Sequence, residues 1–93
     1  MHIGILTLEF RLEGCRSLKE KRQRLGRLRD RFGRAPNVAV CEDAHQDSHQ
    51  LARWSFVAVG SRQQVVERTL GGIERDVQEC ADARIIGVER ELI

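Results

Sequence analysis

The order in which two hydrophobic periods follow one another constrains the fold of this chain more than any other feature. Alternating apolar and polar residues are typical of strands, and apolar residues spaced by three or four are typical of helices. The alternating segments are 2–12, 37–42, 51–60 and 83–92, and the helical segments are 18–33 and 62–80. The order strand, helix, strand, strand, helix, strand predicts a ferredoxin-like α+β fold (βαββαβ). In that fold both helices cover one face of a four-stranded antiparallel sheet.

The alternation also indicates which strand faces lie in the core. In the first strand, Leu6, Leu8, Phe10 and Leu12 share one face. Both faces of 51–60 are apolar, which is typical of a central strand. We expect Trp54 and Phe56 of this segment to point into the core. In the last strand, Ile86, Val88 and Leu92 are expected to share one face.

The two helical segments differ in their apolar stripes. The stripe of 18–33 is narrow and consists of Leu18, Leu25, Leu28 and Phe32. The stripe of 62–80 is continuous and consists of Val66, Leu70, Ile73, Val77 and Cys80. We expect Ser17, in a capping box with Glu20, to cap the first helix and Ser61 to cap the second. Gly71 and Gly72 each weaken the second helix by about 1 kcal/mol relative to alanine, and close packing is one explanation for them.

Composition limits the size and location of the protein. The 93 residues, 41% hydrophobic and 32% charged, are typical of one globular domain over 1–93. No apolar run reaches the roughly 18 residues that cross a bilayer, and the alternating N-terminus does not resemble a signal peptide. Three cysteines without a CxxC pair favour a cytoplasmic protein in which each cysteine is a small buried hydrophobe.

Positive charge is concentrated in residues 16–34. This stretch holds nine lysines and arginines and two acids, a local charge of +7 in a chain whose net charge is +2. Such asymmetry predicts a surface for a polyanion. The candidate residues are Arg16, Lys19, Lys21, Arg22, Arg24, Arg27, Arg31 and Arg34. The alternative is a solvated helix surface that only keeps the protein in solution.

The charges in this stretch have different expected roles. We expect Lys19, Arg24, Arg27, Arg31 and Arg34 to face solvent, because they lie away from the apolar stripe. The others, Lys21, Arg22 and Arg29, flank the stripe, and their stems can cover core edges.

Exposed aromatic residues, which stack on bases in RNA-reading sheets, are not expected here. The chain has no tyrosine, and its tryptophan belongs to an apolar pattern. We therefore expect contact with the phosphates of structured RNA, or with a ribosome-associated particle, rather than base reading. The alternative is a non-enzymatic interaction module with an acidic protein partner.

Cys41, His45 and His49 are spaced by four, as metal ligands on one helical face would be. They fall on a strand end and a polar connector, with no fourth ligand nearby, so we expect no metal and no cofactor. Cys41 with His45 lacks the third group of a nucleophilic triad, and no phosphate-binding glycine loop is present. We expect no enzyme activity. Glu42, Asp43 and Asp47 gather near the histidines and could hold a small ligand.

The sheet face without helices carries Ile3, Ile5, Val57 and Val59. A half-apolar outer face often pairs with another subunit, which predicts a homodimer through these residues. The alternative is a monomer in which neighbouring side chains cover them.

A family resemblance is carried by Ser17-Leu-Lys-Glu-Lys-Arg22, Val38-Ala-Val-Cys-Glu42 and Asp47-Ser-His-Gln-Leu-Ala52. With these segments the chain resembles the YlxP-like bacterial proteins, a domain family of unknown function. The resemblance implies a ferredoxin-like fold. Because family members are often encoded beside translation and ribosome-maturation genes, it also implies contact with RNA or the ribosome. It implies no catalytic residues.

Overall fold

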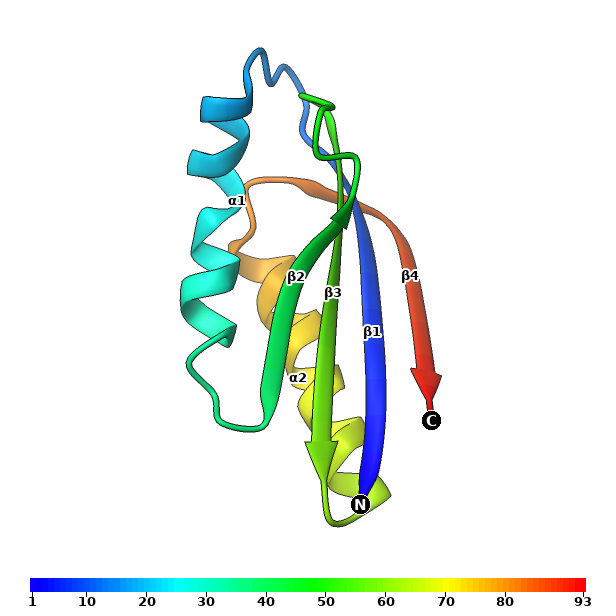
Figure 1. Cartoon of the computed structure of the whole chain (residues 1–93). Helices are drawn as coiled ribbons and strands as arrows, with labels where there is room; N and C mark the ends of the chain where they lie inside the picture. Colours follow the sequence, from blue (N-terminus) through cyan, green and yellow to red (C-terminus); the bar gives the residue numbers. More distant parts are fainter.

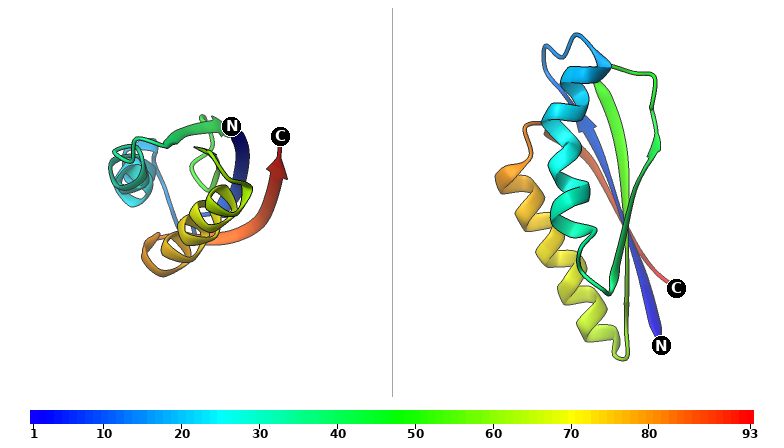
Figure 2. Two further views of the ribbon diagram at one scale, coloured as in Figure 1. Left: turned by 90° about the horizontal axis from the view of Figure 1, so that it is seen from below. Right: turned by 60° about the vertical axis from the view of Figure 1, so that its left-hand side comes forward.

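The computed structural model describes all 93 residues and has six regular elements (Figure 1). They are β1 (His2–Arg11), α1 (Leu18–Phe32), β2 (Val38–Ala44), β3 (Leu51–Gly60), α2 (Gln63–Cys80) and β4 (Arg84–Leu92). The strands form one antiparallel sheet in the order β2-β3-β1-β4. Both helices lie on the same face of this twisted sheet (Figure 2). The ferredoxin-like prediction and the central position of β3 are confirmed.

The start of each helix tests the capping predictions. Ser17 caps α1, since its Oγ accepts a hydrogen bond from the Glu20 backbone N–H at 3.0 Å. The prediction for α2 was wrong, because the N-cap position is Arg62 rather than Ser61 and no side chain caps the helix. An Ala at Gly71 would have no atom within 4 Å of its Cβ. Close packing therefore does not explain that glycine.

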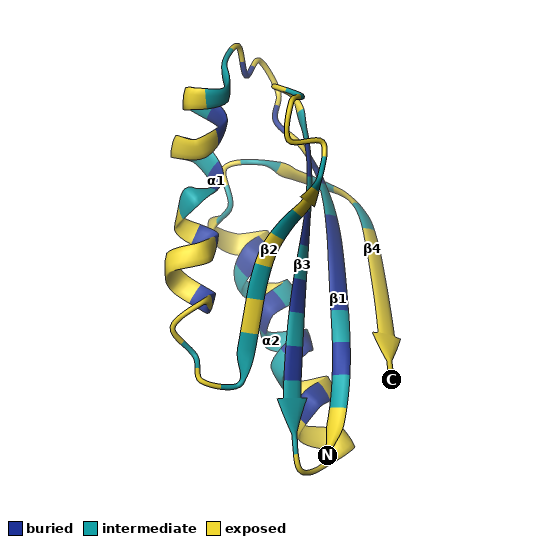
Figure 3. Cartoon of the chain, viewed as in Figure 1, coloured by how far each residue is buried: buried dark blue, intermediate teal, exposed yellow.

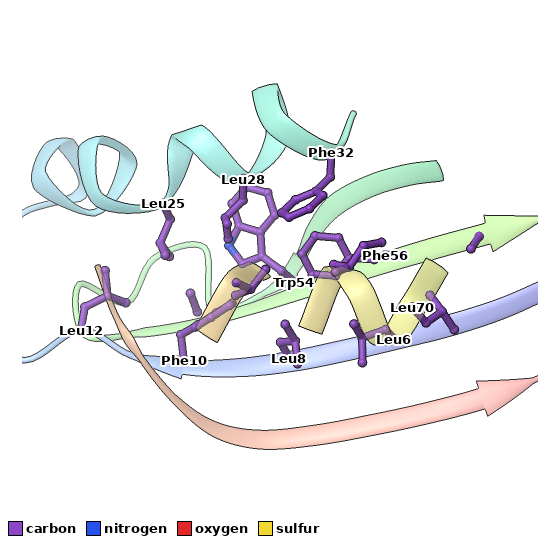
Figure 4. Close-up of a cluster of buried hydrophobic side chains, with 14 of the residues drawn as sticks. Leu6, Leu8, Phe10, Leu12, Leu25, Leu28, Phe32, Trp54, Phe56 and Leu70 are labelled. Carbon is purple, nitrogen blue, oxygen red and sulfur yellow. The ribbon is translucent and has the colours of Figure 1, made fainter. Parts of the chain in front are cut away.

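The core lies between the inner face of the sheet and the two helices. Leu6 and Leu8 of β1 stand opposite Phe56 and Trp54 of β3, and all four are buried. Figure 4 shows Trp54 beneath Leu28 of α1, and Phe56 beside Phe32, whose ring centroid is 5.7 Å away. Trp54 thus points into the core as predicted. The cysteine prediction was right only for Cys15, since Cys41 and Cys80 are exposed.

Strand β4 forms one edge of the sheet and is largely exposed (Figure 3). A register shift opposite Glu9 and Phe10 places Ile85 across from Phe10, so the strand does not keep one strict alternation. Its large apolar side chains remain accessible, with exposed fractions of 46% for Ile86, 45% for Val88 and 41% for Leu92. Of the partly buried residues in this strand, Ile85 packs against the core.

The molecule is elongated, with extents of 42 × 23 × 22 Å. One face of the sheet carries no helix (Figure 2). Neither helix is long and apolar enough to cross a membrane.

Candidate functional site

Most basic residues in the 16–34 stretch are exposed and free of ion pairs. These residues are Arg16, Lys19, Arg22, Arg27, Arg29 and Arg34. Arg31 is also exposed, but its guanidinium lies 3.4 Å from a carboxylate oxygen of Asp76 on α2. Exposed pairs of this kind contribute little stability, so Arg31 remains available to a stronger anion. The stretch therefore presents a dense positive surface along α1.

Arg24 was predicted to face a partner, and the structure corrects this. Its side chain is only 16% exposed. The guanidinium donates hydrogen bonds to the backbone carbonyls of Glu13 and Asp82, both at 2.9 Å. It also lies 3.4 Å from Glu20 Oε2, one turn earlier on α1. Arg24 thus joins α1 to the β1–α1 and α2–β4 connections through its Nε and Nη1 groups.

Lys21 was also proposed for the charged surface, and it is instead buried, with an exposed fraction of 4%. Its Nζ donates hydrogen bonds to the backbone carbonyls of His45 at 2.7 Å and Ser48 at 2.9 Å. The same Nζ lies 3.0 Å from Glu42 Oε2. The ammonium group thus makes two hydrogen bonds and one ion pair within the chain. Lys21 therefore holds the β2–β3 connection against α1 and adds no charge to the surface.

A pocket of about 330 Å³ opens beside Lys21, between α1 and β2. Leu18 and Leu25 of α1 supply its apolar walls, and Arg22 and Arg29 supply cationic groups. Glu42 of β2 and Trp54 of β3 belong to the same lining. The pocket thus combines apolar, anionic and cationic groups within one small volume.

Two polar atoms in the pocket lining lack a hydrogen-bond partner. The indole Nε1 of Trp54 is buried and meets no acceptor. Leaving a buried donor unpaired costs about 1–3 kcal/mol. Glu42 Oε2 is also buried without a directed hydrogen bond, so its 3.0 Å contact with Lys21 is an ion pair in unfavourable hydrogen-bond geometry. Both atoms therefore belong to residues that line the pocket, and both are left without a hydrogen bond inside the protein.

Sequence reasoning placed Trp54 in the core and Glu42 in an acidic cluster, and did not connect them. The alternation along β2 nevertheless indicated that Glu42 faces the core. Val38, Val40 and Glu42 alternate toward the core, because they stand opposite the buried Ala58, Phe56 and Trp54. Glu42 therefore occupies a position where the pattern requires an apolar residue. On α1, Lys21 likewise lies within the buried stripe. These two charged residues at buried positions form an ion pair with each other.

The structure does not bring Cys41, His45 and His49 together as a metal site, and no cluster of metal-ligating side chains is present. Cys41 stands opposite Ser55, on the sheet face away from the helices. His45 has a positive φ of 64° in the β2–β3 connection, and its Nε2 lies 3.3 Å from Glu9 Oε2.

The predicted dimer residues lie together on the uncovered sheet face. Ile3 pairs with Val59 and Ile5 with Val57 across β1 and β3, and all four are half-buried. Along the same strands the surface becomes polar. The Thr7 hydroxyl lies 3.3 Å from that of Ser55, which donates to Asp43 Oδ2 at 2.8 Å. The apolar patch is therefore bounded on one side by a hydrogen-bonded network.

The strand order, with both helices on one face, places the chain in the ferredoxin-like class. A solved structure described as protein YJCS, from structural genomics, shares this fold. It is 10% identical with a TM-score of 0.61, and the match covers 96% of each chain. SnoaB, a cofactor-independent oxygenase from Streptomyces nogalater, is 13% identical with a TM-score of 0.48, over 99% of this chain and 90% of that one.

No curated protein matches the sequence. Residues 3–90 match the family described as "Protein of unknown function (DUF503)". The chain therefore belongs to the DUF503 family. The narrower resemblance to YlxP-like proteins stays a prediction.

Proposed function

We propose that this protein is a non-catalytic, cytoplasmic RNA-binding protein that contacts the phosphates of structured RNA, alone or in a ribosome-associated particle, through the basic surface of α1. The observation that carries the proposal is the group of six exposed cations without ion-pair partners in residues 16–34. Lysine and arginine at such density attract a phosphate backbone by charge, without reading sequence.

The internal contacts of Lys21 and Arg24 refine this proposal. Both side chains are committed to other parts of the chain, so they stabilise α1 in place rather than bind RNA. If each free cation neutralised one phosphate, about six counterions would be released. The logarithm of the affinity would then fall with the logarithm of salt concentration at a slope approaching about −5.

The test compares two triple charge reversals in a binding assay with a fluorescent RNA hairpin across a salt series. The first changes Lys19, Arg27 and Arg34 to Glu, which avoids the pocket. The matched control changes Arg62, Arg68 and Arg75 to Glu on and beside α2, where these residues are exposed and form no ion pairs. We expect the first to weaken binding at least tenfold more than the control. A flat salt response, or equal losses in both proteins, would contradict the proposal.

We also propose that a second copy of the chain covers the uncovered sheet face. The support is the half-exposed group of Ile3, Ile5, Val57 and Val59, over which no element packs. A twofold dimer would present two copies of the basic surface and increase avidity for RNA. Sedimentation equilibrium at tens of micromolar measures the mass. A strictly monomeric species would contradict the proposed dimer. It would not affect the RNA proposal, which the charge reversals test separately.

A further inference from the structure

The pocket between α1 and β2 holds a hydrogen-bond donor without an acceptor. Trp54 is 4% exposed, and its Nε1 has no partner in the chain. Figure 4 shows the indole beneath α1 with its nitrogen on the side toward Leu25, another residue of the pocket lining. The unpaired donor therefore belongs to a residue that lines the pocket.

An acceptor lies beside this donor. Glu42 and Trp54 are directly paired across β2 and β3, so their Cβ atoms are about 5 Å apart on the same face. The Glu42 side chain is 22% exposed and belongs to the pocket lining, while its Oε2 is buried against Lys21. A ligand that matches both groups needs a hydrogen-bond acceptor for the Trp54 indole N–H. Next to that acceptor it needs N–H donors for the Glu42 carboxylate.

The size and the remaining lining favour a flat base with an attached phosphate. A volume of about 330 Å³ is at the lower end of the roughly 300–1,000 Å³ range of ligand pockets. Leu18 and Leu25 provide apolar contact for a ring. Arg22 and Arg29 provide charge for a phosphate, and the Arg29 guanidinium lies 5.7 Å from the centroid of the Trp54 ring.

Among the RNA bases, guanine fits this donor and carboxylate best. Its Watson–Crick edge places the O6 acceptor beside two adjacent donors, N1–H and the 2-amino group. The two donors suit a carboxylate, and O6 suits the indole N–H. The Watson–Crick edges of adenine, cytosine and uracil each carry only one donor position.

We infer that the pocket binds a guanine nucleotide, supplied by an unpaired guanosine of the RNA held on α1. In this arrangement Trp54 Nε1 donates to O6, Glu42 accepts from N1–H and the 2-amino group, and Arg22 and Arg29 contact the phosphate. The RNA source rests on the proposed function, because the two arginines belong to both the pocket and the basic surface. The guanine site itself rests on the pocket.

The single tryptophan provides a direct assay, because it gives one indole N–H resonance in a proton–nitrogen spectrum. Guanosine monophosphate is titrated against inosine monophosphate, which lacks the 2-amino group, and adenosine monophosphate. We expect guanosine monophosphate to move the indole resonance and to bind at least tenfold more tightly than either analogue. An indole resonance that none of the three moves, or equal affinity for all three, would overturn the inference.

Two variants test the assigned groups. Glu42→Gln should abolish the preference for guanine over inosine, whereas Glu67→Gln, on the exposed part of α2, should preserve it. Because Glu42→Gln also leaves Lys21 without its ion pair, Trp54→Phe is the second variant. This variant keeps an aromatic ring, but the ring is smaller and has no N–H donor. We expect at least fivefold weaker guanosine monophosphate binding by calorimetry. Unchanged binding by a folded Trp54→Phe protein would contradict the role of the indole.

RNA hairpins separate this inference from the proposed function. One hairpin carries an unpaired guanosine in its loop, and the other carries adenosine there. Salt-dependent binding of both hairpins with equal affinity and an unmoved indole would refute the guanine site and support the α1 proposal. An indole shift with guanosine monophosphate, combined with RNA binding that the α1 reversals do not weaken, would support the guanine site and refute an RNA held on α1 as its source.

Discussion

Replacing Lys21 by methionine removes the ammonium that joins α1 to the β2–β3 connection while retaining a side chain of similar length. Three contacts are lost, to Glu42 Oε2 at 3.0 Å and to the carbonyl oxygens of His45 and Ser48 at 2.7 and 2.9 Å. Breaking a buried ion pair from one side costs about 3–5 kcal/mol, since the other charge is left uncompensated. The Glu42 side chain keeps 22% exposure, so water solvates part of its charge. We therefore expect Lys21→Met to lower the free energy of unfolding by about 3 kcal/mol, near the lower end of that range.

Urea unfolding measures this loss. Trp54 is the sole tryptophan and lies beside the pair, so its fluorescence reports the packing of α1 on the sheet. Circular dichroism at the same urea concentrations tests whether the whole domain unfolds in one step. The matched control is Lys19→Met, two residues earlier on α1, where the side chain is exposed. An exposed substitution of this kind should change the free energy of unfolding by no more than about 0.5 kcal/mol.

A double-mutant cycle isolates the ion pair from the other contacts of Lys21. Replacing both partners, Lys21→Met with Glu42→Leu, removes the uncompensated charge and continues the apolar stripe of β2. The double variant should be more stable than Lys21→Met alone, by at least about 1 kcal/mol. The reasoning is refuted if Lys21→Met unfolds within about 0.5 kcal/mol of the original protein, or if the two single effects simply add.

Three further substitutions test local packing by the same urea measurement. Gly4→Ala should destabilise by about 1–3 kcal/mol, because its Cβ would lie 2.7 Å from Val66 Cγ1 and 2.8 Å from Leu70 Cδ1 in the core. An unchanged midpoint would show that this region of the core can expand freely. Gly71→Ala should stabilise by up to about 1 kcal/mol, since no atom approaches its Cβ within 4 Å, and a loss of stability would contradict this. Ser17→Ala should cost about 1 kcal/mol through loss of the 3.0 Å hydrogen bond to the Glu20 N–H, whereas Ser17→Asp should retain most of the stability.

Periodicity was sufficient to predict the fold because each element buries one regular stripe. The alternation along β1 and the spacing along α2 both survive in the structure, with Leu6, Leu8, Val66 and Leu70 fully buried. Periodicity did not predict the irregular pairing of β4 or the residue at which α2 begins. The register shift in β4 depends on pairing with β1, which the sequence of β4 alone does not contain. The start of α2 was misplaced by one residue because a serine was available one position before the actual N-cap.

The roles of charged residues were harder to predict, because their partners are distant in sequence. Arg24 binds carbonyl oxygens 11 and 58 positions away, and Lys21 binds carbonyl oxygens 24 and 27 positions away. A helical projection separates a solvent face from a core face, but it cannot show that a connection from elsewhere covers part of the solvent face. The surface that remains for a partner could be defined only after those connections were located.

The segment 17–22, on which the family resemblance partly rests, gains a physical explanation from these contacts. Ser17 caps α1, Leu18 forms a wall of the pocket, and Lys21 holds Glu42 and the β2–β3 connection in place. Only Lys19 and Arg22 of the segment present free charge, and Arg22 does so beside the pocket. A segment selected only for positive charge would tolerate arginine at position 21, yet a guanidinium there would have to fit a site shaped for a compact ammonium. Lys21→Arg should therefore disturb the pocket while conserving the charge of α1. Weaker guanosine monophosphate binding with unchanged salt dependence of RNA binding would show that the segment builds the pocket rather than the basic surface.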